Sequence, residues 1–136
     1  TALNAIVDSL DSGVGANAKI KILGGTQADS PDDAAFTGTT LAEIDLGTGA
    51  VFPAATTGTG ADANYVIANR TTDATDTNAN ADGTASWFRA VNKGGIAIID
   101  GSVGTAAADL ILNSVAISVG QTVKITNWKM RLAYKN

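Results

Sequence analysis

The chain contains no cysteine and no histidine. Their absence excludes disulfide bonds, Cys/His zinc sites and nucleophilic chemistry that depends on Cys–His or Ser–His–Asp arrangements. Charged side chains are also scarce, at 16% of residues, and acidic ones outnumber basic ones by 13 to 9. Because nucleic-acid binding needs a basic surface that displaces counterions, we expect no nucleic acid among the partners. There is no run of about 18 apolar residues, so we expect no membrane partner either.

The residues that are present favour one soluble domain. A length of 136 residues suits a single core, and a hydrophobic content of 45% argues against disorder. Abundant Thr and Gly favour strands joined by turns. The first residues, 1–4, lack the positive region and the long apolar stretch of a secretory signal, which predicts a product made in the cytoplasm. Thr1 is the residue that removal of an initiator Met leaves.

One short segment has a helical period. Leu3, Ile6, Val7 and Leu10 are spaced i, i+3, i+4 and i+7, which places them on one face of a helix that Gly13 would end. A helix of about three turns is not stable alone in water. These four residues therefore pack on their own domain or form a partner-binding face, and the pattern leaves both open. We divide the chain into an N-terminal helix or arm at 1–17 and a β-sandwich domain at 18–136.

From residue 18 onward the apolar period changes to two, which indicates strands. The turn at 92–95 predicts a hairpin, the polar run 71–84 predicts a surface loop, and 101–104 reads as a further turn. No helical crossovers separate the strands, so we predict an all-β fold: an antiparallel, jelly-roll-like β-sandwich with a short N-terminal helix or arm. The expected strands are 19–22, 42–46, 64–69, 86–91, 96–100, 109–113, 115–119 and 122–134.

The last predicted strand changes its pattern partway along. Val123 and Ile125 are apolar at odd positions, whereas Trp128, Met130 and the apolar residues after them occupy even positions. Since side chains alternate between the two faces of a strand, the change near residue 127 predicts a bulge, or a strand that passes from one sheet to the other.

A calcium loop is the first candidate site. Asn78, Asn80, Asp82 and Gly83 match the opening of an EF-hand loop, whose twelfth position supplies a bidentate Glu. Here that position is Arg89, which repels a cation. We therefore interpret the segment as a solvated polar loop and expect no metal and no cofactor, although the sequence alone leaves open whether an ion binds there.

Catalysis and aromatic recognition are the other candidates. Carboxylate pairs fall in turns or on exposed strand faces, and Glu43 is the sole glutamate, so we predict that the chain is not an enzyme. Trp87, Phe88, Trp128 and Tyr134 occupy strand positions, which predicts core anchors. The alternative for these aromatic residues is an interface role.

Four stretches together resemble a known family: DDAAFTGTTLAEI at 32–44, GTASWFR at 83–89, DGSVG at 100–104 and DLILN at 109–113. Their order and spacing resemble small virion proteins of tailed bacteriophages, in particular capsid cement (decoration) proteins with a jelly-roll fold. The likeness covers about residues 18–126.

The resemblance implies a structural virion protein on the capsid exterior. Its partners would be the major capsid protein and a second copy of itself, a homodimer being favoured over a homotrimer. The alternative is a β-sandwich recognition module, such as a fibre, adhesin or carbohydrate-binding domain. That alternative requires a solvent-exposed aromatic platform or a bound ion, and exposure of Trp87 or Trp128 would favour it.

Overall fold

The chain folds into β-strands with one α-helix near its N-terminus. The computed structural model describes residues 2–34 and 38–134, so the part of the resemblance at 35–37 lies outside the described residues. The described elements are α1 (Ala2–Leu10), β1 (Lys19–Leu23), β2 (Thr40–Asp45), β3 (Thr56–Thr57), the 3-10 helix η1 (Gly60–Asp62), β4 (Tyr65–Arg70), β5 (Ala74–Asp76), β6 (Gly83–Thr84), β7 (Trp87–Val91), β8 (Ala97–Gly104), β9 (Leu110–Leu112), β10 (Ala116–Ile117) and β11 (Val123–Ala133).

Two sheets that share β8 form the body of the domain. The first has the order β2-β1-β7-β8, and the pairing continues from β8 through β9, β11, β4 and β3, with β5 also beside β11. Strands β6 and β10 form a separate two-stranded ribbon. Every pairing between the described strands is antiparallel except that of β8 with β9. The predicted class, an all-β sandwich with a short N-terminal helix, is confirmed. The parallel pair of β8 and β9 makes the sheet mixed and not purely antiparallel.

The core lies between the two sheets. In β1 the isoleucines are fully buried and the lysines that alternate with them are half-buried, as expected for a strand with one face in the core. All residues of β7 are buried. The ring of Trp128 on β11 lies 5.4 Å from that of Phe88 on β7 and 4.5 Å from that of Phe52. Trp87 and Trp128 are both buried, so their predicted core role is confirmed.

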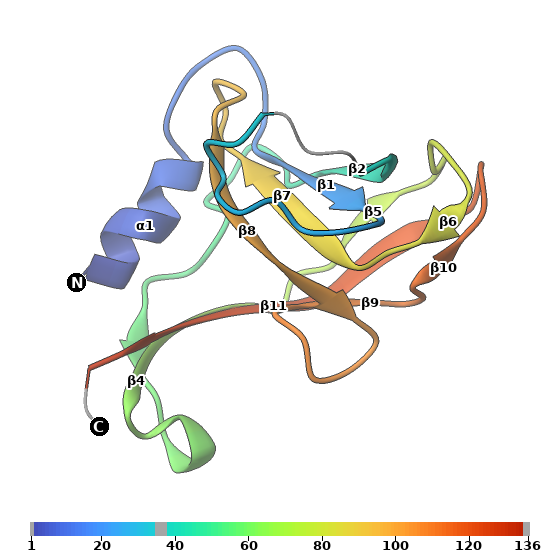
Figure 1. Ribbon diagram of the computed structural model, residues 1–136. Coiled ribbons are helices and arrows are strands. Elements are labelled where there is room, and N and C mark those ends of the chain that lie inside the picture. The colour runs from blue at the N-terminus through green and yellow to red at the C-terminus, as the bar shows by residue number, and fades with distance from the viewer. Residues whose placement is uncertain (1, 35–37, 135–136) are drawn as a thin grey trace.

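Strand β11 contains the predicted irregularity. Its register against β9 shifts between Ile125 and Asn127, and this bulge keeps both Ile125 and Trp128 in the core. Beyond Trp128 the strand continues to Ala133 paired with β4. Figure 1 shows this β4–β11 pair extending to the left, below α1.

Two predictions about loops and turns are wrong. The run 71–84 is not wholly a surface loop, because it contains β5 and β6, and Ala74 and Ala79 within it are buried. Backbone hydrogen bonds fix this run: the Ala79 N–H donates to the Gln121 carbonyl, a pairing that polar side chains do not reveal. The predicted turn at 101–104 belongs to β8. Gly101 serves packing there, since a Cβ at that position would lie 2.6 Å from the Phe88 ring.

Candidate interaction site

The structure separates the four residues predicted to bind a partner. Leu3, Val7 and Leu10 are almost fully buried and belong to the chain's own core. Ile6 is 39% exposed. Of the two roles that the sequence left open, the intramolecular one accounts for three of the residues. Ile6 is the member of the set that a partner can reach in this structure.

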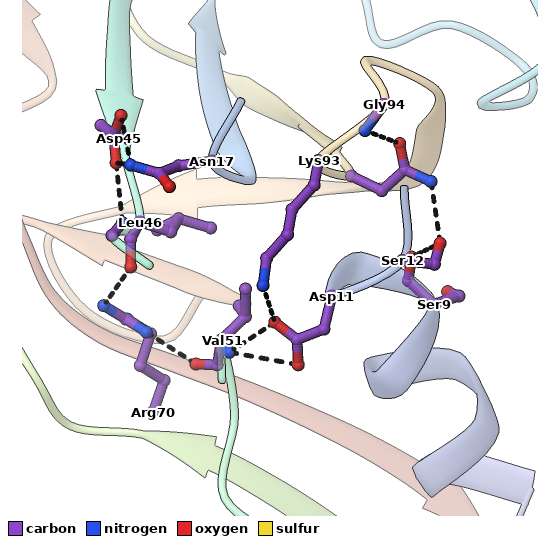
Figure 2. Close-up of polar contacts among 12 residues, drawn as sticks. Ser9, Asp11, Ser12, Asn17, Asp45, Leu46, Val51, Arg70, Lys93 and Gly94 are labelled. Atoms are coloured by element: carbon purple, nitrogen blue, oxygen red, sulfur yellow. Dashed lines mark hydrogen bonds and ion pairs between the residues drawn. The ribbon is translucent and has the colours of Figure 1, made fainter. Parts of the chain in front are cut away.

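Polar contacts hold α1 and the segment after it against the sandwich (Figure 2). The Asp11 carboxylate accepts a hydrogen bond from the Val51 N–H at 3.1 Å and lies 3.9 Å from the Lys93 ammonium. At the other end of the helix, the Asn4 side-chain oxygen accepts from the Ala55 N–H at 2.8 Å. These contacts connect α1 to the segment before β3 and to the β7–β8 hairpin, so the helix is fixed at both ends.

The side chain of Arg70 is buried, and Figure 2 shows it next to Leu46 and Val51. Its guanidinium donates to the Val51 carbonyl at 2.7 Å and to the Leu46 carbonyl at 3.4 Å. Burial lowers the pKa of Arg70, and the Asp11 charge opposes that shift. The arginine therefore satisfies backbone carbonyls of the 46–51 segment and holds this segment on β4.

A groove of about 460 Å³ opens beside α1, between the ends of β8 and β11. Its lining is largely apolar and includes Leu3, Ile6, Ile98, Met130 and Leu132. Ile6 and Leu132 are each 39% exposed, so the groove continues onto an apolar outer surface. The size and lining lie within the range of binding pockets, and this groove is our candidate interaction site.

Charged side chains at the groove are largely paired. Asp100 forms a two-point contact with Arg89, which is why the pKa of Arg89 is raised, and both side chains are buried. Asp62 on η1 accepts hydrogen bonds from both Lys129 and Arg131. The Lys129 hydrogen bond is the main cause of the lowered pKa of Asp62. Two cations share the Asp62 carboxylate here, and the carboxylate of Asp109 lies in the groove lining with them.

The other residues that the sequence singled out have structural partners. The Asp82 carboxylate accepts from the Val119 N–H at 2.7 Å, and the Asp76 carboxylate accepts from the Asn78 N–H at 2.9 Å. Arg89, at the twelfth position of the calcium-loop pattern, points to Asp100. Within residues 2–34 and 38–134, no three acidic side chains gather in a group that could hold a metal ion.

The tryptophans do not form a surface platform. Trp87 is 1% exposed and its indole N–H donates to the Gly24 carbonyl at 3.2 Å. Trp128 is fully buried. The prediction that Tyr134 is a core anchor is wrong: this residue directly follows β11 and is 54% exposed. Its hydroxyl donates to the Ala63 carbonyl at 3.0 Å.

The groove residues on β8 and β11 were not identified from the sequence. One sequence signal pointed to this groove. Near Asn127 the apolar residues change from odd to even positions, and Met130 and Leu132 then continue the apolar face beyond the buried Trp128. When the apolar face of a strand continues past the core, it indicates a surface that contacts another segment or another molecule. No corresponding signal marks Ile98, because it lies in a run of apolar residues.

Comparison of the chain with protein-family models, with curated proteins and with solved structures found no match. No helix in the described part of the chain has the length and apolar character needed to cross a membrane.

Proposed function

We propose that the chain is a structural virion protein that binds the outer surface of an icosahedral phage capsid and stabilises it by bridging major capsid protein subunits. The observation that carries the proposal is the apolar surface at the groove, where Ile6 and Leu132 are exposed beside α1 and Tyr134 follows. Contiguous apolar surface on a protein exterior is typical of contact with another macromolecule. In this proposal the chain acts through contact area and performs no catalysis.

The positions of the resemblance stretches support the proposal. DGSVG (100–104) and DLILN (109–113) meet at the groove, since Asp100, Gly101 and Asp109 belong to its lining. They are joined there by the Ser102 N–H, which donates to the Asp109 carboxylate at 3.0 Å. Phe88 of GTASWFR (83–89) belongs to the same lining, so three of the four stretches that resemble cement proteins contribute to the groove.

Stabilisation follows from mass action. If the folded chain binds only the expanded lattice, the free energy of binding stabilises both the folded chain and the expanded shell. Because many copies would bind one shell, the small stabilising effect of each copy would add up over the whole shell. We further propose that the chain associates as a homodimer on the capsid exterior, and sedimentation of the purified chain tests this.

The alternative, a recognition module for glycans or a host surface, is less well supported. Its expected platform needs an exposed tryptophan, and Trp87 and Trp128 are both buried. Tyr65 is also engaged, because the Arg131 guanidinium lies 5.1 Å from its ring centroid. We therefore prefer the structural role.

The test is binding to expanded shells that lack this chain. Purified chain is mixed with such shells, free and bound chain are separated by sedimentation, and the shells are then heated. We expect saturable binding and a higher temperature of shell disruption. Unexpanded shells are the control and should bind little. Failure to bind expanded shells, or binding without any gain in heat resistance, would refute the proposal.

A further inference from the structure

A second cavity lies where the segment before β3 meets the end of β4. Its volume is about 400 Å³, and its lining consists of residues 50–53 and 69–72. Among these lining residues Arg70 alone is charged, and it is 7% exposed. No described residue lines both this cavity and the groove. We call it the Arg70 cavity and treat it as a separate site.

The guanidinium of Arg70 has one edge that lacks a full set of partners. Figure 2 shows its two hydrogen bonds: Nη1 donates to the Val51 carbonyl at 2.7 Å, and Nη2 donates to the Leu46 carbonyl at 3.4 Å. Nε is buried and has no hydrogen-bond partner. Nε and Nη2 direct N–H groups along the same edge of the planar guanidinium. Because a buried N–H without an acceptor is destabilising, this edge is expected to meet an acceptor.

Arg89 shows what such an edge binds in this chain. Its Nη1 and Nη2 donate to the carbonyls of Asp33, at 2.7 Å, and Ser30, at 3.0 Å. In addition, its Nε and Nη2 each hold one carboxylate oxygen of Asp100 at 2.8 Å. Arg70 has the two carbonyl contacts of this pattern and lacks the carboxylate. Since two-point binding of a carboxylate is a strong and specific use of the edge, a carboxylate is the group that would complete the pattern.

The nearby acidic side chains have other partners. Within the described residues no carboxylate forms an ion pair with the Arg70 guanidinium. The charge of Asp11 acts on it, but Asp11 faces the Lys93 ammonium at 3.9 Å. Asp73, next to the cavity lining, lies 2.7 Å from the Lys124 ammonium. The guanidinium therefore keeps a single positive charge without a counter-ion, which suits a singly charged ligand.

A second unsatisfied donor lies beside Arg70. Trp128 of β11 is directly opposite Arg70 in the pairing with β4, so both side chains lie on the same face of the sheet. The indole N–H of Trp128 is buried without a partner, and its ring packs 4.5 Å from that of Phe52 in the cavity lining. Asn69 projects to the other face of β4, so its unpartnered Oδ1 lies away from these donors. Two neighbouring N–H donors thus favour a ligand that brings oxygen atoms.

We infer that the Arg70 cavity binds a carboxylate group, whose two oxygens accept hydrogen bonds from Nε and Nη2 of Arg70. Nε is shielded from solvent in this structure, so the ligand enters when the lining moves locally. Pro53, Thr71 and Thr72 in that lining are exposed. The inference goes beyond the proposed function and does not depend on it. The carboxylate can come from a small molecule or from an acidic side chain of a partner, and the experiment separates these sources.

The first experiment follows side-chain N–H signals by NMR while acetate is added at neutral pH and constant ionic strength. We expect a saturable shift of the Arg70 Nε–H signal. Its hydrogen exchange should slow about tenfold when free acetate is about ten times the dissociation constant, because bound chain is then about ten times more abundant than free chain. The Nε–H of Arg89 and the indole N–H of Trp87 already have acceptors and serve as internal controls.

The indole N–H of Trp128 refines the position of the ligand. A shift together with Arg70 would place the carboxylate against both donors, and a shift of Arg70 alone would leave binding to its guanidinium edge upheld. Acetamide, which has a similar shape and no charge, should bind at least about tenfold more weakly than acetate. Glutamate capped at both backbone ends tests the source: tighter binding than acetate indicates an acidic side chain of a partner, and equal or weaker binding indicates a small molecule.

Three variants locate the binding. Thr72→Glu places a carboxylate in the exposed lining, where it repels or replaces the ligand, and should weaken acetate binding about tenfold or more. Thr77→Glu makes the same change at an exposed residue outside the lining and should bind as wild type does. Arg70→Lys keeps the charge, loses the planar edge and should abolish binding. Thermal melts establish folding, and the two threonine variants decide the matter if Arg70→Lys does not fold.

Several results would overturn the inference. These are an Arg70 shift no larger with acetate than with chloride, equal binding of acetamide, or equal binding by Thr72→Glu and Thr77→Glu. A cross-peak between the Arg70 Nε–H and water that acetate leaves unchanged would identify an ordered water only, and would also overturn it. Binding to expanded shells is measured separately, so failure of this inference leaves the proposed function untouched, and failure of shell binding leaves the carboxylate site untouched.

Discussion

At the scale of single residues, the buried pair of Arg89 and Asp100 organises one side of the groove. The guanidinium contacts both carboxylate oxygens at 2.8 Å and also donates to the carbonyls of Asp33, at 2.7 Å, and Ser30, at 3.0 Å. One side chain therefore joins β7, β8 and the segment between β1 and β2. Such a pair is specific in its geometry, and loss of one member leaves a buried charge.

We predict that Asp100→Asn lowers the free energy of unfolding by about 3–5 kcal/mol, because Arg89 then stays buried without its counter-ion. The control is Glu43→Gln, which breaks the exposed pair with Lys19, whose side chains are 36% and 37% exposed. That change should cost less than about 1 kcal/mol. Urea denaturation measures both. Similar losses in the two variants would show that burial of the Arg89 pair has no special energetic effect.

Residue-level burial was only partly predictable from the sequence. Trp87 and Phe88 were expected in the core because they are large and lie in a strand, and they are there. Arg89 gave no such signal, since an arginine between apolar residues reads as the solvent-facing position of a strand. Its partner is eleven residues away across the hairpin. The burial becomes visible only when the hairpin register pairs Arg89 with Asp100.

At the scale of elements, α1 is a structural part of the sandwich. Its apolar spacing was correctly read as a helix, but spacing alone does not distinguish a face that packs inward from one that binds a partner. Both need the same stripe of apolar residues. The contacts of Asp11 and Asn4 with distant backbone groups settle the orientation, and those contacts depend on the tertiary fold.

We expect Leu10→Ala to lower the free energy of unfolding by about 2–5 kcal/mol, since Leu10 is fully buried and its truncation leaves a cavity. Ile6→Ala on the same helix should change stability by about 0.5 kcal/mol or less, because that side chain is 39% exposed. Chemical denaturation followed by tryptophan fluorescence compares them. An equal loss at both positions would contradict the assignment of the two helix faces.

The 3-10 helix η1 is connected to β11 by a pH-sensitive contact. Lys129 and Arg131 hold the pKa of Asp62 below its ordinary value. A lowered folded-state pKa contributes stability above the unfolded value of about 4, and this contribution is lost as the pH falls through the folded value. We predict that the urea midpoint of wild type falls more steeply below about pH 4 than that of Asp62→Asn. Parallel pH profiles would show that the contact contributes nothing in solution.

Local sequence signals predicted some of the strands and missed others. The β7–β8 hairpin and the bulge before Asn127 were both predicted, because turn residues and side-chain alternation are local signals. The parallel pairing of β8 with β9 was not predicted, since the run 101–104 reads as a turn. Strand β5 was missed because three residues of mixed polarity carry no period.

At the scale of the whole molecule, the groove results from how the sheets separate. Strand β8 leaves the first sheet to join β9, while β11 continues outward with β4. The space between them is partly filled by α1, whose buried residues complete the core. The class of fold follows from composition and strand spacing. The groove does not, because it depends on the direction of strand ends that are far apart in the sequence.

Folding and binding should be separable on this scaffold. If the lattice binds only the folded chain, shells at 100 times the dissociation constant add about 2.7 kcal/mol to its stability. We predict that expanded shells slow core amide exchange of Leu10→Ala, which is destabilised but retains Ile6 and Leu132 at the surface. Leu132→Glu should show the opposite behaviour, near-normal stability alone and little protection from shells. Equal protection of both variants would mean that the apolar surface at the groove does not contact the shell. The expected difference would assign stability to the buried Leu10 and shell binding to the exposed surface around Leu132.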